Sequence, residues 1–188
     1  MSHPQSTDVP LETLHTGRFL NLVRRGKWEY VERHGVTGVV GIVAVTDEGR
    51  LLLVEQFRPP LQKQVIELPA GLAGDIAGEE AESMATAAAR ELVEETGYEA
   101  RETRLLTEAA SSAGLTDEMI TLFLMTGLTK VSEGGGDESE NIIVHEIPLS
   151  DLPNWLEERR AAGWALDPKI YAGLFWLTHL GWKVGLHG

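Results

Sequence analysis

The pattern of hydrophobic and polar positions divides the chain into strand-like segments separated by turns. Residues 39–45 form an almost unbroken aliphatic run, which is typical of a strand buried on both faces. Asp47–Glu48–Gly49 predicts a hairpin turn into a second strand at residues 51–57. Further strands are expected at residues 65–68, 104–109, 120–128 and 142–147.

The N-terminal part is less regular. Residues 1–15 are expected to be flexible, whereas residues 17–36 alternate in a way that predicts a meandering pair of strands turning at Gly26. We find no internal repeat and no linker in the rest of the chain, from residue 37 onward. The sequence therefore predicts a flexible N-terminus at residues 1–15 and one domain at residues 16–188.

Three helices complete the predicted pattern. An alanine-rich run favours a helix over residues 79–96, which Gly97 closes. A second helix is expected at residues 149–162 with Ser150 as its N-cap, and Asp167–Pro168 is a typical start for a third. This set of elements predicts an α+β fold in which helices pack on both sides of a mixed sheet.

Three carboxylates lie together in the last turns of the first predicted helix. The spacing of Glu91, Glu94 and Glu95 puts them on one helix face. Each anion at the carboxyl end of a helix is disfavoured by about 0.3–1 kcal/mol. A hard cation such as Mg²⁺ or Mn²⁺ on this face would compensate. The alternative is a solvated acidic face, on which Arg90 and Glu94 form an ordinary ion pair.

Composition narrows the class of protein. A formal net charge of −13 argues against nucleic acid or an anionic membrane as the main partner. The absence of cysteine excludes disulfides, thiolate catalysis and zinc–thiolate sites. Met1–Pro10 lacks the apolar centre of a signal peptide, and no apolar run is long enough to span a membrane. We therefore expect a cytoplasmic protein.

The residues around the three acids resemble the signature of the Nudix hydrolases. Seven residues separate Glu82 from the run Arg-Glu-Leu-Val-Glu-Glu-Thr-Gly-Tyr at residues 90–98. The family pattern is G-x5-E-x7-R-E-U-x-E-E-x-G-U, where U is a bulky aliphatic residue. A match at so many fixed positions is far more specific than a single glycine motif.

This chain departs from the pattern at two positions. Tyr98 replaces the last aliphatic residue, and Ile76 stands where the first glycine is expected. The nearest fitting glycine is Gly71, which implies an insertion of five residues within residues 72–81. The glycines and the aspartate of that stretch predict a loop.

Other segments resemble the subgroup of Nudix enzymes that cleave ADP-ribose and nucleoside diphosphate sugars. They are Trp28–Glu29 and residues 54–59, 67–71 and 137–142, so the resemblance covers roughly residues 17–180. It implies an α/β/α sandwich and a homodimer in which strands from about residues 17–36 are exchanged. It also implies hydrolysis of ADP-ribose, or of UDP- or GDP-sugars, to a nucleoside monophosphate and a sugar phosphate. Ala113 replaces a proline common in ADP-ribose-specific members, which favours a broader nucleotide-sugar substrate range.

The same resemblance implies roles for individual residues. Glu91, Glu94, Glu95 and the backbone carbonyl of Ala70 would hold Mg²⁺ (or Mn²⁺), with Glu91 and Glu95 counted among the catalytic residues. A salt bridge between Glu82 and Arg90 would be the structural frame of the loop and helix.

Four residues are candidates for substrate contact. Arg58 is suited to phosphate or ribose because a guanidinium can form two parallel hydrogen bonds, although it can also simply cap a strand end. Trp28 can stack on a nucleobase, or belong to the core. Glu67 and Leu72 are the other two, on either side of a turn that Pro69–Ala70–Gly71 predicts.

A general base is still needed, because carboxylates bound to metal are poor bases. The resemblance implies that it lies in the glycine-rich loop at residues 130–141, which we expect to be mobile. The candidates are Glu138 and Glu140. Glu140 is favoured because it immediately precedes a predicted strand, and the alternative is a solvated loop acid.

Two other classes of function remain open. One is a Nudix hydrolase of another substrate, such as a dinucleoside polyphosphate. The other is a non-catalytic nucleotide-binding module, which would have no need for acids at the unfavourable end of a helix.

Overall fold

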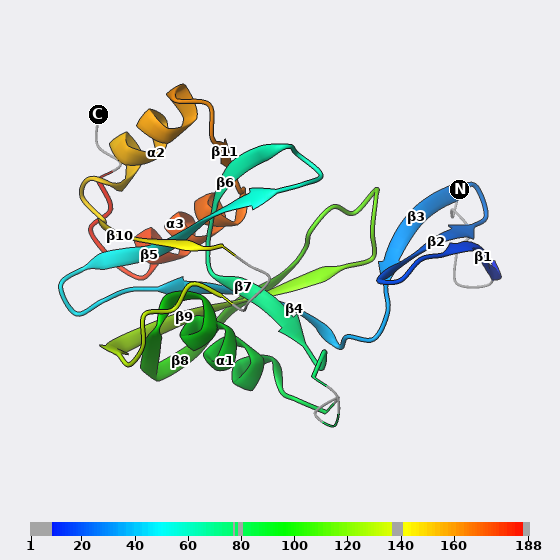
Figure 1. The fold of residues 1–188 in the computed structure, drawn as a ribbon, viewed down its shortest axis with the longest axis horizontal. Helices are drawn as coiled ribbons and strands as arrows, with labels where there is room; N and C mark the ends of the chain where they lie inside the picture. The colour runs from blue at the N-terminus through cyan, green and yellow to red at the C-terminus, as the bar shows by residue number, and fades with distance from the viewer. Residues whose placement is uncertain (1–8, 77, 79–80, 137–140, 186–188) are drawn as a thin grey trace.

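The structure is a computed structural model that describes residues 9–76, 78, 81–136 and 141–185. A layered body carries a small separate sheet at one end (Figure 1). In chain order the elements are β1 (Leu11–Thr16), β2 (Leu20–Arg25), β3 (Trp28–Arg33), β4 (Gly38–Ala44), β5 (Arg50–Arg58), β6 (Lys63–Glu67), β7 (Ala70–Ala73), α1 (Met84–Thr96), β8 (Tyr98–Ala110), β9 (Met119–Lys130), β10 (Ile143–Pro148), α2 (Leu152–Ala161), β11 (Ala165–Leu166) and α3 (Lys169–His179).

The N-terminal sheet is a three-stranded antiparallel meander, β1-β2-β3. Gly26 makes the expected turn with a φ of 62°. We expected residues 1–15 to be flexible, but β1 begins at Leu11 and pairs with β2. β1 has exposed residues throughout and few apolar ones, so the hydrophobic pattern did not reveal it. The sheet contacts the body through a hydrogen bond of 2.9 Å from Val31 N–H to the Leu115 carbonyl.

The body contains two four-stranded sheets, β10-β5-β6-β11 and β7-β4-β9-β8. β4 runs parallel to β9, and β6 parallel to β11, while the other pairs are antiparallel. The predicted turn at residues 47–49 is present, with Gly49 N–H donating to the Thr46 carbonyl at 2.9 Å, but β4 and β5 are joined by one isolated bridge, Val45–Leu51, and then enter different sheets. Both strands are buried on both faces, so the turn sequence alone does not select their partners.

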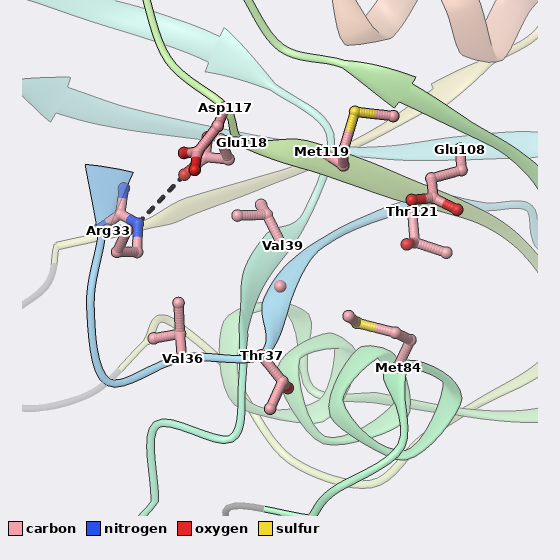
Figure 2. Close-up of a pocket in the computed structure, with 11 residues that line it drawn as sticks. Arg33, Val36, Thr37, Val39, Met84, Glu108, Asp117, Glu118, Met119 and Thr121 are labelled. Carbon is pink, nitrogen blue, oxygen red and sulfur yellow. Dashed lines mark hydrogen bonds and ion pairs between the residues drawn. The ribbon is translucent and has the colours of Figure 1, made fainter. Parts of the chain in front are cut away.

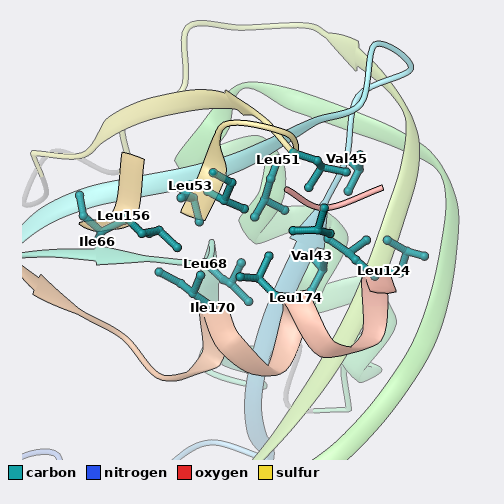
Figure 3. Packing of buried hydrophobic residues seen from close by; sticks show 14 of the residues in the cluster. Val43, Val45, Leu51, Leu53, Ile66, Leu68, Leu124, Leu156, Ile170 and Leu174 are labelled. Atoms are coloured by element: carbon teal, nitrogen blue, oxygen red, sulfur yellow. The ribbon is translucent and has the colours of Figure 1, made fainter. Parts of the chain in front are cut away.

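Helices cover both sides of the body. Leu52 of β5 packs in the cluster that includes Leu92 of α1, whereas Leu51 and Leu53 belong to the opposite cluster, with α2 and α3. Figure 3 shows this second cluster, with Leu174 of α3 among the strand residues. The predicted α+β fold of mixed sheets between helices is confirmed, with the mixed sheet divided into two.

Several boundaries differ from expectation. α1 begins five residues later than predicted, because the hydroxyl of Ser83 caps it by accepting a hydrogen bond of 3.1 Å from Thr86 N–H. The Ser150 hydroxyl does not cap α2 but donates to the side chain of Asp151. β7 replaces the predicted turn at residues 69–71. Among the described residues, no helix is both long and apolar enough to cross a membrane.

Candidate functional site

The candidate site lies where β7 crosses the carboxyl-terminal half of α1. The strand and the helix approach so closely at Gly71 that a Cβ atom there would lie 1.9 Å from Cδ of Glu91. Only glycine permits this approach. Gly71 is the glycine that fits the family pattern when an insertion of five residues is allowed. The packing of β7 against α1 requires a glycine at the same position.

Two of the three carboxylates predicted to bind metal accept hydrogen bonds from the backbone of β7. Oε1 of Glu91 accepts a hydrogen bond of 3.3 Å from Leu72 N–H, and Oε2 of Glu95 accepts one of 3.0 Å from Ala70 N–H. Glu95 is buried, with 4% of its surface exposed. The structure thus brings Glu91, Glu95, Ala70 and Leu72 together.

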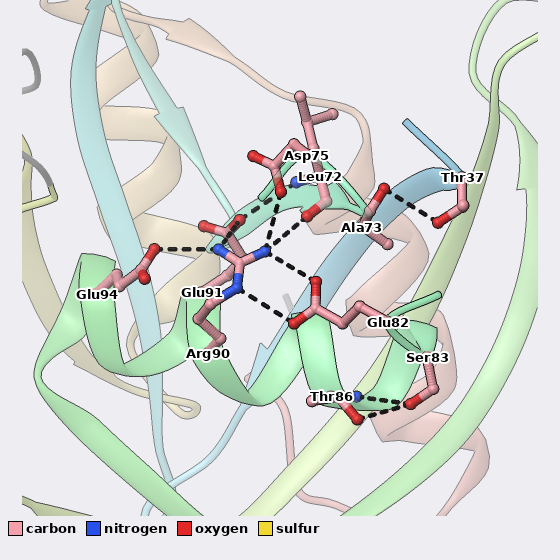
Figure 4. Close-up of polar contacts among 10 residues, drawn as sticks. All are labelled: Thr37, Leu72, Ala73, Asp75, Glu82, Ser83, Thr86, Arg90, Glu91 and Glu94. Carbon is pink, nitrogen blue, oxygen red and sulfur yellow. Dashed lines mark hydrogen bonds and ion pairs between the residues drawn. The ribbon is translucent and has the colours of Figure 1, made fainter. Parts of the chain in front are cut away.

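Arg90 joins the loop before α1 to the helix itself (Figure 4). Its Nε and Nη2 atoms donate to the two carboxylate oxygens of Glu82, at 3.3 and 3.2 Å. The side chain of Glu82 is almost fully buried. Glu82 precedes the N-cap of α1, so this ion pair connects two separate segments rather than two turns of one helix.

The same guanidinium also holds the inserted loop and two of the acids. Its Nη2 donates to the Leu72 carbonyl at 2.9 Å and to Asp75 at 3.2 Å. Its Nη1 donates to Glu91 at 2.8 Å and to Glu94 at 3.2 Å. Asp75 was not predicted as a site residue, because it lies in the insertion and has no counterpart in the family pattern.

The carboxylates differ in their preferred charge state. Burial raises the pKa of Glu91 to about 7, although the charge and hydrogen bond of Arg90 act to lower it. The hydrogen bond from Arg90 holds the pKa of Glu82 below its ordinary value. Burial acts to lower the pKa of Arg90, but Glu82 and Glu91 outweigh it and raise that pKa. Glu91 is therefore ionised at an energetic cost that a nearby cation would reduce.

The donor set is suited to a hard divalent ion. Glu91 and Glu95 offer carboxylate oxygens from adjacent turns of α1 against one strand, and such ions prefer oxygen ligands. Glu94 is turned toward Arg90 and is half-exposed. Across the residues that the structure describes, no three acidic or histidine side chains already converge on one point. These residues can bind a divalent metal ion if the carboxylate of Glu94 leaves Arg90 and binds the ion instead.

Arg58 and Glu67 form a second polar pair, on neighbouring strands β5 and β6. Nε and Nη2 of Arg58 donate to the two oxygens of Glu67, at 2.6 and 2.8 Å. The pair lines a cavity of about 310 Å³ with Leu61, Val65 and Leu166 among its apolar walls. The guanidinium is thus held in a defined orientation beside an apolar cavity.

Trp28 lies away from these residues, in the N-terminal sheet (Figure 1). Its exposed fraction is 57%, so the core alternative is wrong. With Tyr30, Arg25 and Thr116 it lines a cavity of about 210 Å³, which also includes Ala113. The structure does not bring Trp28 near α1 of the same chain.

The two general-base candidates, Glu138 and Glu140, lie outside the described residues. The segment before them, residues 131–136, was expected to belong to a mobile loop. It instead contacts the end of α1, where Gly135 and Gly136 N–H donate to the carbonyls of Glu95 and Glu94. Three consecutive glycines were the only sequence signal for this contact.

A further cavity of about 310 Å³ lies between β4, β9 and the start of α1 (Figure 2). Glu118 on its wall pairs with Arg33 at 3.1 Å, which connects β3 to the body. Glu108 and Asp117 also line it. None of the predicted site residues lines this cavity, so we assign it no part in the candidate site.

Comparison with known proteins adds independent findings. The chain matches the NUDIX domain over residues 36–168. It is 38% identical over 124 residues to a methanol dehydrogenase activator of Bacillus methanolicus, covering 65% of this chain and 64% of that protein. It is 41% identical over 123 residues to the ADP-ribose pyrophosphatase of Bacillus subtilis, covering 65% and 64% respectively. The chain thus spans slightly less than two thirds of the length of either relative.

Two more distant similarities are consistent with the match to the NUDIX domain. The chain is 32% identical over 140 residues to the ADP-sugar pyrophosphatase of Mus musculus, covering 71% of this chain and 62% of that protein. The crystal structure of an ADP compounds hydrolase superposes with a TM-score of 0.69 at 20% identity, covering 96% of this chain and 99% of that one. At that identity the structural likeness shows the shared fold.

The opposite pKa shifts of Glu91 and Glu82 predict opposite effects of their glutamine variants without metal. The raised pKa of Glu91 lowers stability progressively as the pH rises from 4.5 to about 7. In EDTA at pH 8, Glu91→Gln should therefore increase the free energy of unfolding by on the order of 1–3 kcal/mol, with little gain at pH 5. Urea denaturation at both pH values measures this.

Glu82→Gln is the matched control. The lowered pKa of Glu82 means that its contribution is present above 4.5 and is lost as the pH falls through its folded-state pKa. This variant should lower the free energy of unfolding at pH 8 by about 1–3 kcal/mol. Equal destabilisation by both variants at pH 8 would show that burial of the Glu91 charge is not costly.

The close approach at Gly71 predicts that Gly71→Ala destabilises the protein by about 1–3 kcal/mol, because the new methyl group displaces Glu91. Gly114→Ala is the control, since a Cβ atom there meets nothing within 4 Å. Truncating the clashing side chain in Gly71→Ala/Glu91→Ala should recover part of the loss. Additive effects in this double-mutant cycle, measured by urea denaturation, would contradict the contact.

Proposed function

Because this chain belongs to the Nudix family, we propose that it hydrolyses the diphosphate bond of nucleoside diphosphate sugars, including ADP-ribose. The products are a nucleoside monophosphate and a sugar phosphate. The ADP-ribose and ADP-sugar pyrophosphatases among its relatives support this substrate class. The observation that carries the proposal is the pair Glu91 and Glu95, both hydrogen-bonded to the backbone of β7 beside the Arg90–Glu82 ion pair.

Nudix enzymes generally use divalent metal ions. We assign Mg²⁺ or Mn²⁺ to Glu91, Glu94, Glu95 and the carbonyl of Ala70. Held there, such an ion would bind the diphosphate oxygens, lower the pKa of the attacking water and stabilise negative charge on the leaving phosphate. Glu91 and Glu95 keep their orientation through the β7 N–H groups, and Glu94 is released by Arg90. Arg90 meanwhile stays bound to Glu82 and Leu72.

Arg58, Glu67 and Leu72 contact the nucleotide in this proposal. Glu67 orients the guanidinium of Arg58 through two hydrogen bonds, so that binding loses little side-chain entropy. The apolar cavity next to the pair offers a surface for a flat or sugar ring. Glu140, with Glu138 as the alternative, is the proposed general base.

Trp28 contributes to substrate binding only if a second copy supplies it, because its sheet is separate from α1 in one chain (Figure 1). We propose a homodimer in which residues 17–36 dock on the partner. The sheet exposes apolar side chains at Phe19, Leu20, Leu22 and Trp28. Residues 9–36 also carry five Arg and Lys side chains against three acids, in a chain of net charge −13. A basic, partly apolar sheet is complementary to the acidic body. A cytoplasmic location stays a prediction.

The activity is tested by phosphate release from ADP-ribose, UDP-glucose, GDP-mannose and a dinucleoside polyphosphate, with a coupled phosphatase, in Mg²⁺ or EDTA. Turnover should require Mg²⁺ and extend to several sugar diphosphates. Glu95→Gln should reduce kcat by about 10²-fold or more, because a metal ligand is lost. Glu108→Gln is the control acid outside the site.

The same assay separates the two base candidates. Removal of a general base costs about 10²–10⁴-fold, so Glu140→Gln should lose activity to that extent and Glu138→Gln should not. The reverse result would assign the base to Glu138. Absence of turnover with all four substrates would refute the proposed function and favour a binding module.

The exchanged dimer predicts complementation between two defective chains. Trp28→Ala should raise KM, and Glu95→Gln should be inactive. After unfolding and refolding together, the mixed dimer contains one site with Trp28 from one chain and Glu95 from the other, so it should recover wild-type KM. Light scattering gives the oligomeric state. A monomer, or no recovery of KM in the mixture, would contradict the exchange.

A further inference from the structure

Residues 131–136, which we call the glycine strap, are bound to the carboxyl end of α1. Gly135 N–H donates to the Glu95 carbonyl at 2.9 Å, and Gly136 N–H donates to the Glu94 carbonyl at 3.0 Å. The last carbonyls of a helix have no partner within it. The strap supplies donors to these two, which belong to proposed metal ligands.

The contact is backbone against backbone. A Cβ atom on Gly134 would lie 2.4 Å from the carbonyl carbon of Thr96, and one on Gly97 would lie 2.2 Å from the Ser132 carbonyl oxygen. Gly134, Gly135 and Gly136 have φ angles of 68°, 108° and 82°. These angles suit glycine. The strap therefore reaches the helix only because Gly134 and Gly97 have no side chains.

The strap is held at both ends. Val131 and Ser132 N–H donate to the Gly97 carbonyl at 2.8 and 3.1 Å. Ile142 N–H, just before β10, donates to the Gly135 carbonyl at 3.2 Å, and Ile142 is buried. The strap thus connects the end of α1 to β10, and its position is set by the body of the protein.

The N–H donors of the strap are also suited to the negative charge at the carboxyl end of α1. The last turn of α1 contains Glu94 and Glu95 and no basic residue. A lysine there would offset the helix dipole but would also compete with a metal for the carboxylates. Backbone N–H groups offset the dipole by binding the carbonyls and leave the carboxylates to other partners.

We propose that the glycine strap is a positioning element for the metal site. By binding the carbonyls of Glu94 and Glu95, it fixes the last turn of α1 in the rotation that directs the carboxylate of Glu95 toward β7 and that of Glu94 toward Arg90. This inference rests on the proposed metal-dependent function. The competing explanation is that the strap is a helix cap that contributes only to stability. The two explanations predict different metal affinities for a strap variant measured well below its unfolding temperature: weakened for a positioning element, unchanged for a cap.

The test uses the full chain and Mn²⁺ alone, with free Mn²⁺ measured by electron paramagnetic resonance. Gly134→Ala pushes the strap off the helix end and should weaken Mn²⁺ binding by about tenfold or more, as for other outer-shell partners of metal ligands. Gly163→Ala is the matched control, because Gly163 has a φ of 99° but no atom within 4 Å of an added Cβ. It should bind Mn²⁺ within about twofold of wild type, since no outer-shell contact changes.

Unfolding temperatures are measured for each variant. If Gly134→Ala does not fold, Gly135→Ala replaces it. A Cβ there meets only the Ile142 carbonyl oxygen at 3.9 Å, but the φ of 108° is unfavourable for alanine and strains the residue whose N–H binds the Glu95 carbonyl. Unchanged Mn²⁺ affinity in the folded strap variant would refute the positioning role, as would equal weakening in Gly163→Ala. Failure of the wild type to bind Mn²⁺ would instead refute the proposed metal-dependent function, and this inference with it.

Discussion

The guanidinium of Arg90 is the interaction on which the candidate site depends. It forms ion pairs with Asp75, Glu82, Glu91 and Glu94, and it also binds the Leu72 carbonyl. These groups come from three segments that are separate in the sequence: the end of β7 with the inserted loop, the residue before the helix cap, and the helix itself. Without this cation, closely spaced carboxylates would repel one another in a poorly solvated place.

The site combines one stabilising acid with one destabilising acid. Glu82 is held as an anion by Arg90, whereas burial makes the charge of Glu91 unfavourable. Burial raises the pKa of Glu91 even though Arg90 pairs with it, so the negative charge of this carboxylate is only partly compensated. An unfavourable charge that packing nevertheless places against β7 is typical of a site that gains a cation when it functions.

The surroundings of α1 show how such an acidic helix is tolerated. Gly71 lets β7 approach one side, and the glycine strap binds the carbonyls at the end. In both places backbone N–H groups act as the electropositive partners. Neutral donors of this kind lower the cost of the acids without a side-chain cation at the carboxyl end, and so they are compatible with a metal ion.

The sequence by itself determined the elements with strong local signals. The signature from Glu82 to Tyr98 identified the Nudix family, and the close of α1 at Gly97 followed from glycine conformation. The aliphatic runs predicted β4 and β5, because continuous apolar residues in short segments favour buried strands. These features depend on neighbours in the sequence, so local pattern was sufficient.

Only the tertiary structure decided what depends on distant partners. β4 and β5 separate into two sheets because burial on both faces does not specify a neighbour. Asp75 contacts Arg90, which lies 15 positions further along the chain. In the strap, Gly136 contacts Glu94, which lies 42 positions earlier. Trp28 lies far from α1 because its sheet is a separate unit (Figure 1). Residue types predicted the chemistry of the site, whereas its packing and hydrogen-bond geometry required the folded chain.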